Sequence, residues 1–188
     1  RDPSHRVYSD ASYIGIGGWS SDFGFLWRIT RDDLSALGFD MKAVARLSSE
    51  PKQGKTPGLH INPPEYVAAL INLWISLVLV IETGARDGGY IVQLNADNTS
   101  ALAWMSEAAR TPDPFLQGLA RLGSALLVAA ARLLTKIVPT HIPGIKNTEA
   151  DALSRPAAKN SPLVPSLASV IAQWPNLQTC RILLEIAD

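Results

Sequence analysis

The segment from residue 135 to 155 limits the possible folds more than any other part of the chain. It begins with a predicted strand that delivers His141, and Pro143-Gly144 then predicts a turn. Thr148 follows as the expected N-cap of a short helix that carries Asp151. This arrangement places His141 and Asp151 at one rim of a sheet. A purely structural explanation is also open, in which Thr148 begins a capping box and a histidine at a strand end is ordinary polar surface.

The composition indicates a compact domain without a strong overall electrostatic field. A chain of 188 residues, 47% of them apolar, can bury a real core and carry an appendage. Lys plus Arg and Asp plus Glu each total 17, so the net charge is zero and no global field attracts nucleic acid. Cys180 is the only cysteine, which excludes an internal disulfide and a cysteine cluster for zinc. We therefore expect a reducing intracellular location, in the cytoplasm or the nucleus.

The longest apolar run, Ala68 to Ile81, is interrupted by Asn72 and Ser76. It is too short to span a bilayer comfortably and predicts a buried helix, so we expect no membrane partner. No signal peptide is visible, and the first residue is Arg1 rather than methionine. The chain is therefore expected to be a piece of a longer protein.

The N-terminal part predicts three antiparallel strands, the first over residues 6–12 and the third over residues 24–30. Asp10 lies inside the first strand. Asp is depleted in strands because its short side chain competes for backbone hydrogen bonds, and a metal ion at the sheet surface would explain its presence. The alternative is that Asp10 begins the turn into the second strand.

An apolar helix is predicted from Asn62 to about Thr83. Asn62 is the expected N-cap, Pro63 suits the first helical position, and Glu65 falls three residues after the cap. A capping box alone would therefore account for Glu65. Apolar residues lie all round this helix, which indicates burial on more than one side. It should pack against the sheet and be covered by a second helix.

A near-continuous apolar strand from Tyr90 to Ala96 is expected at the centre of the sheet, and Asp97 follows it directly. An Asp between a strand and a helix is commonly an N-cap. The C-terminal end of a central strand is also where open α/β sheets place their functional sites, so Asp97 is a candidate for chemistry. A long apolar helix over residues 112–134 is suited to cover the helix that carries Glu65.

Two segments fall outside this pattern. Residues 31–60 form an insertion between the third strand and the first long helix. The C-terminal part contains four prolines and two short helix candidates, over residues 167–174 and 177–186. We therefore divide the chain into a domain over residues 1–156 and a proline-containing helical extension over residues 157–188.

Four carboxylates thus fall at successive element ends: Asp10, Glu65, Asp97 and Asp151. The last three each have a capping explanation, but a shared site explains all four at once. Carboxylates that cluster closely repel one another and need cations to stay ionised together. Hard oxygen ligands favour Mg²⁺ or Mn²⁺.

The segment from His141 to Arg155 resembles the end of the ribonuclease H domain of retroelement polyproteins, especially gypsy-type and DIRS-type retrotransposons. In those domains a His-x-Pro-Gly turn precedes an Ala-Asp-Ala-Leu-Ser-Arg helix, and the match covers fifteen consecutive positions. The ten-residue separation between His141 and Asp151 is the one ribonucleases H use between their mobile-loop histidine and last catalytic aspartate. The family pattern is also matched by Ser9-Asp10-Ala11-Ser12, by Asn62 and Glu65, and by Asp97.

The resemblance implies an α/β ribonuclease H-like fold: a five-stranded mixed sheet of three antiparallel and then two parallel strands, with helices on both faces. It implies an endonuclease that hydrolyses the RNA strand of RNA/DNA hybrids with two Mg²⁺ ions, for which Mn²⁺ can substitute. Its partners would be the hybrid and an adjoining reverse transcriptase polymerase domain in a larger polyprotein.

The resemblance also implies residue roles. Asp10 would bridge both metals, and Glu65 and Asp97 would hold one ion. Asp151 would hold the other, and His141 would assist proton transfer or product release. Minor-groove contacts, including recognition of the 2′-OH, are expected from Ser12, Asn62 and Thr99.

Two other functions are open. The first is a catalytically silent ribonuclease H-like module that binds protein or nucleic acid, against which the set of four carboxylates argues. The second is an integrase-like or exonuclease-like phosphoryl transferase that acts on DNA. Integrases lack the helix glutamate at this place and the spacing from His141 to Asp151.

Overall fold

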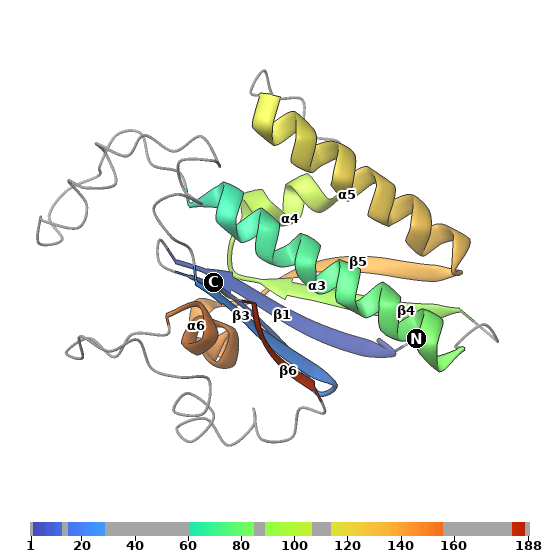
Figure 1. Cartoon of the computed structure of the whole chain (residues 1–188), viewed down its shortest axis with the longest axis horizontal. Coiled ribbons are helices and arrows are strands. Elements are labelled where there is room, and N and C mark those ends of the chain that lie inside the picture. The colour runs from blue at the N-terminus through green and yellow to red at the C-terminus, as the bar shows by residue number, and fades with distance from the viewer. Residues whose placement is uncertain are drawn as a thin grey trace, which may run out of the picture.

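A computed structural model of the chain describes residues 2–12, 15–28, 61–84, 89–106, 114–155 and 182–186. The insertion predicted over residues 31–60 and the helix predicted over residues 167–174 lie outside these ranges. The described elements form one sheet with helices packed against it (Figure 1).

The sheet is mixed, with its antiparallel strands at one side. β1 (His5–Ala11), β2 (Gly15–Ser20) and β3 (Phe23–Arg28) pair as an antiparallel meander. β4 (Tyr90–Ala96) runs parallel to β1, and β5 (Thr135–His141) runs parallel to β4. The strand order β5-β4-β1-β2-β3 confirms the predicted arrangement. Because β1, β4 and β5 are parallel, their C-terminal ends meet at one edge of the sheet.

A sixth strand, β6 (Ile182–Ile186), pairs with β3 and runs parallel to it. The sheet therefore has six strands rather than five, and the helix predicted over residues 177–186 is wrong for residues 182–186. A short apolar run does not distinguish strand from helix by its periodicity. The edge of β3 offers unpaired backbone N–H and C=O groups, and β6 satisfies them. The domain boundary at residue 156 stays a prediction.

Helices lie on both faces of the sheet, as predicted. α3 (Asn62–Thr83), α4 (Thr99–Ser106) and α5 (Pro114–Arg132) lie on one face. A short 3₁₀ turn, η1 (Gly144–Lys146), follows β5 and leads into α6 (Thr148–Ser154), which lies on the other face (Figure 1).

Two neighbouring glycines of β2 show that α6 and α3 lie on opposite faces of the sheet, because successive residues of a strand point to opposite sides. A Cβ on Gly17 would lie 2.5 Å from Ala150 O in α6. A Cβ on Gly18 would lie 2.6 Å from Asn72 Oδ1 in α3. The absence of these two side chains therefore lets a helix approach β2 closely on each face.

α3 is the central helix of the core, although its length and composition alone would also allow it to cross a membrane. The prediction that α3 is buried on more than one side is only partly confirmed, because Trp74 is 57% and Ile81 is 60% exposed. α5 approaches α3 at Gly123, where a Cβ would lie 2.2 Å from the Tyr66 hydroxyl oxygen. Beside this contact the two helices leave an apolar hollow of about 200 Å³, lined by Val67, Leu70, Ile71, Trp74, Leu119, Leu122 and Leu126.

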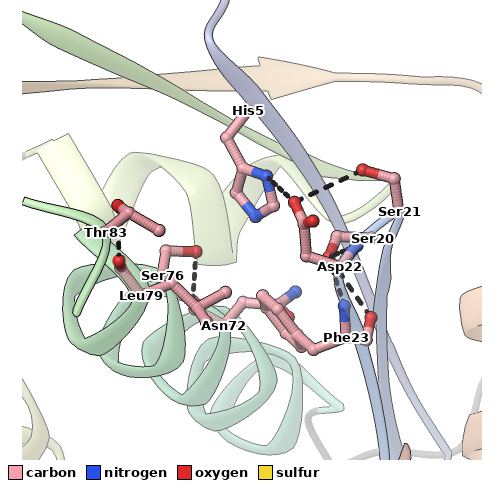
Figure 2. Close-up of polar contacts among 9 residues, drawn as sticks. All are labelled: His5, Ser20, Ser21, Asp22, Phe23, Asn72, Ser76, Leu79 and Thr83. Carbon is pink, nitrogen blue, oxygen red and sulfur yellow. Dashed lines mark hydrogen bonds and ion pairs between the residues drawn. The ribbon is translucent and has the colours of Figure 1, made fainter. Parts of the chain in front are cut away.

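Polar contacts fix the end of the sheet that lies opposite the C-terminal edge (Figure 2). His5 Nδ1 lies 3.2 Å from Asp22 Oδ2, and the Ser20 hydroxyl accepts a 3.1 Å hydrogen bond from Asp22 N. Burial lowers the pKa of His5, and the charge of Asp22 opposes that shift. Asn72 Nδ2 donates to Tyr8 O at 2.8 Å, which fixes α3 in position along β1.

We expect Gly17→Val to destabilise the fold by about 3 kcal/mol, because the added side chain meets the backbone of α6 rather than a movable side chain. A Cβ at this position would lie 2.5 Å from both Ala150 O and Ser154 N. Urea unfolding measures the change. Gly118→Val on α5 is the control, since a Cβ there has no neighbour within 4 Å. Equal losses in both variants would contradict the close approach of α6.

Candidate metal centre

Three of the predicted carboxylates converge at the C-terminal edge of the sheet. One oxygen each of Asp10, Glu65 and Asp97 lies within 4.8 Å of the other two. Asp10 belongs to β1, Glu65 to the first turn of α3, and Asp97 follows β4 directly. Parallel strands and the N-terminus of α3 thus bring together residues that are far apart in the sequence.

Asp10 lies inside β1, where it is opposite Gly17 of β2. The alternative in which Asp10 begins a turn is therefore wrong. Asp10 is 4% exposed, and its Oδ2 accepts a 2.5 Å hydrogen bond from Ser154 Oγ at the end of α6. Burial raises the pKa of Asp10 to about 6; the Ser154 bond opposes the shift, and the negative charge of Asp97 adds to it.

The helix-capping explanation of Glu65 is also wrong. The N-cap of α3 is Ile61, without a side-chain cap, so the prediction of Asn62 as the N-cap fails by one residue. The Asn62 side chain is instead used in a tertiary contact: its Oδ1 accepts a 2.9 Å hydrogen bond from Asn98 Nδ2. This bond links the N-terminal ends of α3 and α4.

The Glu65 carboxyl group is buried and only partly satisfied. It is 4% exposed, and its Oε2 has no hydrogen-bond partner in the part of the chain that the structure describes. Burial, together with the charges of Asp10 and Asp97, raises the pKa of Glu65 to about 9. A hydrogen bond from the Ala11 backbone acts in the opposite direction. An unpartnered buried carboxylate oxygen needs an explanation, and a bound ion supplies one.

Asn98, rather than Asp97, caps α4. Its Oδ1 accepts a 2.9 Å hydrogen bond from Ala101 N, so the N-cap explanation of Asp97 is wrong. The partly buried Asp97 carboxylate lies against the turn that follows β5. A Cβ on Gly144 would lie 2.9 Å from Asp97 Oδ2, so glycine at this position allows the close approach.

Asp151 and His141 lie outside the cluster of three. Asp151 Oδ1 accepts a 2.7 Å hydrogen bond from Arg155 Nε, one turn further along α6. The charge of Asp151 still contributes to the raised pKa of Asp10, so the two carboxylates are close enough to interact. His141 is exposed at the C-terminal end of β5, where it is opposite Ala96 of β4.

Asn147 and Ser154 attach α6 to β1, a role that the sequence analysis did not predict. Asn147, rather than the predicted Thr148, is the N-cap of α6. Its Nδ2 donates to Ser9 O at 2.8 Å, and the residue is 1% exposed. The available signal was the spacing of Ser154 three residues after Asp151, which places both on one face of a helix.

The predicted substrate contacts lie around the centre, and their role stays a prediction. Ser12 Oγ donates to Ser154 O at 2.6 Å and so also ties the end of β1 to α6. Asn62 is in the amide pair with Asn98, and Thr99 is exposed at the start of α4.

The residues of the centre fit a hard divalent cation. They supply only carboxylate oxygens, which are the ligands that Mg²⁺ and Mn²⁺ prefer. Burial of several like charges is unfavourable without a cation, and within the described ranges no hydrogen bond satisfies Glu65 Oε2.

Strand order, pairing and the helices on both faces define a ribonuclease H-like α/β fold, with an acidic centre at the C-terminal edge of its parallel strands. Among solved structures, the chain is similar to the crystal structure of RNase H1 from the halophilic archaeon Halobacterium salinarum NRC-1. The identity is 19%, the match covers 79% of this chain and 91% of that chain, and the TM-score is 0.41. No family model and no curated protein matches the sequence.

We expect Mg²⁺ to stabilise the folded protein more at pH 8 than at pH 5. The pKa values of Asp10, about 6, and Glu65, about 9, exceed their ordinary values, so the folded protein retains protons that the unfolded chain has lost. Without divalent cations, this contribution to stability is complete below the ordinary pKa values near 4 and is lost as the pH rises through the folded-state values. Mg²⁺ replaces the protons and restores the loss.

The measurement is the increase in Tm when Mg²⁺ replaces EDTA, compared at the two pH values. The increase is the quantity to compare, because the lowered pKa of His5 destabilises the fold below pH 6.5 with or without metal. Glu65→Gln should abolish the increase, whereas Glu82→Gln, at an exposed position of the same helix, should leave it unchanged. Equal increases at pH 5 and pH 8 would refute the linkage.

We expect Gly144→Ala to weaken Mn²⁺ binding about tenfold with little change in stability, because the new methyl group would displace the Asp97 carboxylate. Gly144 is exposed, so the substitution removes no core contact. Titration of the protein with Mn²⁺, followed by electron paramagnetic resonance of the free ion, gives the affinity. Gly118→Ala is the control, and unchanged affinity in Gly144→Ala would contradict the close approach to Asp97.

Proposed function

We propose that the protein is an endonuclease that hydrolyses the RNA strand of RNA/DNA hybrids with divalent cations. One observation carries this proposal: Asp10, Glu65 and Asp97 meet at the C-terminal edge of a ribonuclease H-like sheet, and the buried Glu65 Oε2 has no partner among the residues described. A structural role does not account for the cluster, because taking several carboxylates out of water costs free energy, and the described residues leave Glu65 Oε2 without a compensating partner.

The proposed reaction is in-line attack by water on phosphorus, with breakage of the bond to the leaving 3′ oxygen. Two Mg²⁺ ions, when bound, would lower the pKa of the attacking water and stabilise the charge on the leaving oxygen. Asp10 would contribute to both positions, Glu65 and Asp97 to one and Asp151 to the other. Ser154 holds Asp10 Oδ2 and so fixes the orientation of its carboxylate.

His141 and the polar residues at the helix ends would act on the substrate. His141 is exposed at the rim, where it would transfer a proton or assist product release. The bond between Asn62 and Asn98 holds two amides beside the centre, and Thr99 lies next to them in the chain. Amide and hydroxyl groups can bind the 2′-OH, which is both a donor and an acceptor and is absent from DNA. These contacts, with Ser12, would restrict cleavage to RNA.

We further propose that the domain belongs to the polyprotein of a retroelement of the gypsy or DIRS type and acts beside a reverse transcriptase polymerase domain. The support is the segment His141–Arg155 and its resemblance to such domains. The net charge of zero also fits a domain that leaves much of the grip on the hybrid to a neighbour. An intracellular location, in the cytoplasm or the nucleus, follows from this proposal.

The test is cleavage of a labelled RNA/DNA hybrid with Mg²⁺ or Mn²⁺, beside RNA/RNA and DNA/DNA duplexes of the same sequence. We expect cleavage of the hybrid alone. Asp10→Asn and Glu65→Gln should each reduce the rate by at least about a thousandfold, because each removes a charged ligand from the centre. Glu82→Gln on the same helix as Glu65 should cleave as the unchanged protein does.

The outcomes separate the competing functions. Hybrid binding without cleavage by any folded form, with either metal, would favour the silent module. Cleavage of the DNA duplex would favour an integrase-like or exonuclease-like activity. Hybrid cleavage that survives Asp10→Asn would place the chemistry elsewhere in the molecule.

A further inference from the structure

The end of α6 carries a positive charge next to the one predicted ligand that does not join the cluster. Arg155 Nε donates to Asp151 Oδ1 at 2.7 Å, and the two side chains are one helical turn apart. The carboxylates of Asp10, Glu65 and Asp97 are within 4.8 Å of one another, whereas Asp151 is not part of that group. The arginine thus pairs with the one predicted carboxylate ligand that lies outside the cluster.

We propose that Arg155 is an internal cation that holds Asp151 away from the centre until a substrate phosphate binds Arg155. The second metal position would then form only when the substrate is bound. This inference rests on the proposed function and adds a form of regulation to it. In the free protein, one divalent ion would bind at Asp10, Glu65 and Asp97. The second position would require Asp151 to leave Arg155.

The backbone of Asp151 is already in place for this exchange. Ser154 Oγ donates to Asp10 Oδ2 at 2.5 Å and lies 3.0 Å from Asp151 O, so one hydroxyl contacts both aspartates. Asn147 fixes the other end of α6 through its 2.8 Å bond to Ser9 O. Only the side chain of Asp151 would therefore have to turn, while α6 keeps its position against β1.

The ion pair between Arg155 and Asp151 is suited to exchange with another anion rather than to permanent blocking of Asp151. The side chains of Arg155 and Asp151 are 57% and 46% exposed, and an exposed pair one turn apart on a helix is weak. Arg155 also acts on the centre itself, because its charge lowers the pKa of both Asp10 and Glu65. The charge of Arg155 therefore repels an incoming divalent ion, in addition to pairing with Asp151.

A phosphodiester is the group that would displace Asp151 from Arg155. The planar guanidinium donates two parallel hydrogen bonds to a phosphate as readily as to a carboxylate. When the phosphate binds the Arg155 guanidinium, the Asp151 carboxylate is released and can turn toward Asp10. Binding of the hybrid and binding of the second ion would then be cooperative, and the free protein would be protected from premature loading of both metals.

The test counts the Mn²⁺ ions bound per full chain, by electron paramagnetic resonance of the free ion. We expect one ion in the unchanged free protein and two in Arg155→Gln, with the second bound at least about fivefold more tightly than in the unchanged protein. Arg132→Gln, which removes an exposed arginine at the end of α5, should behave as the unchanged protein does. Asp151→Asn combined with Arg155→Gln should lose the second ion.

A second arm uses a hybrid whose RNA strand carries 2′-fluoro sugars, at concentrations where fluorescence anisotropy shows the complex to be complete. The unchanged protein in this complex should bind two ions. One ion in the complex would overturn the exchange, and one ion in free Arg155→Gln would overturn the blocking role of Arg155.

Failure of this inference and failure of the proposed function give different results. If Arg155→Gln gains the second ion but no form cleaves a hybrid, the role of Arg155 stands and the nuclease proposal falls. If all forms bind one ion yet cleave hybrids, the nuclease proposal stands and the role of Arg155 falls. Binding of no Mn²⁺ by any form would overturn both.

Discussion

Repulsion among buried carboxylates is the constraint on which the arrangement of this molecule depends. Asp10 and Glu65 are each 4% exposed, and both lie close to Asp97. Such a group is stable only if protons, hydrogen bonds or cations offset the repulsion. The fold supplies a hydroxyl to Asp10 and a backbone hydrogen bond to Glu65, but it leaves Glu65 Oε2 without a partner among the described residues. This incomplete compensation, at a point where three carboxylates meet, fits the cation that we propose for the site.

The attachment of α6 to β1 links the geometry of the carboxylate cluster to the packing of the rest of the fold. Gly17 lets the helix lie directly on β2, Asn147 bonds the backbone of Ser9, and Ser12 bonds the backbone of Ser154. Each contact serves stability, but together they also place the Ser154 hydroxyl on Asp10. The helix that closes one face of the sheet is thus also the support of the centre, so its packing and the geometry of the site cannot vary independently.

The sequence predicts the elements of this fold well where an apolar pattern is long. It predicts them less well where the conformation of a segment depends on a single tertiary contact. The strand from Tyr90 to Ala96 and the helix from Asn62 to Thr83 are found where their long apolar runs and the helix-start signals predict them. The short apolar strand β6 was predicted as a helix, because its pairing depends on the open edge of β3 rather than on its own pattern. The sequence also predicts burial of α3 on more than one side, whereas Trp74 of this helix is 57% exposed.

The predictions of helix caps fail for a related reason. Asn62 and Thr148 have the local preference for an N-cap, but Asn62 bonds Asn98, and Asn147 becomes the cap of α6 while bonding Ser9. Tertiary hydrogen bonds outweigh a capping preference worth about 1 kcal/mol. The convergence of Asp10, Glu65 and Asp97 could be predicted, because it follows from strand order. The separation of Asp151 could not, because it depends on a side-chain contact with Arg155.

Protonation explains how the centre tolerates its own charge without a metal. With a pKa of about 9, Glu65 keeps its proton at neutral pH, so the metal-free cluster does not carry the full charge of its carboxyl groups. A divalent cation that uses Glu65 as a ligand must displace this proton, which makes metal affinity depend on pH. Arg155 offsets charge at the rim, and the proton of Glu65 removes charge in the interior. The same carboxylates can therefore persist in a folded chain without a metal and become ligands when a stronger cation replaces the proton.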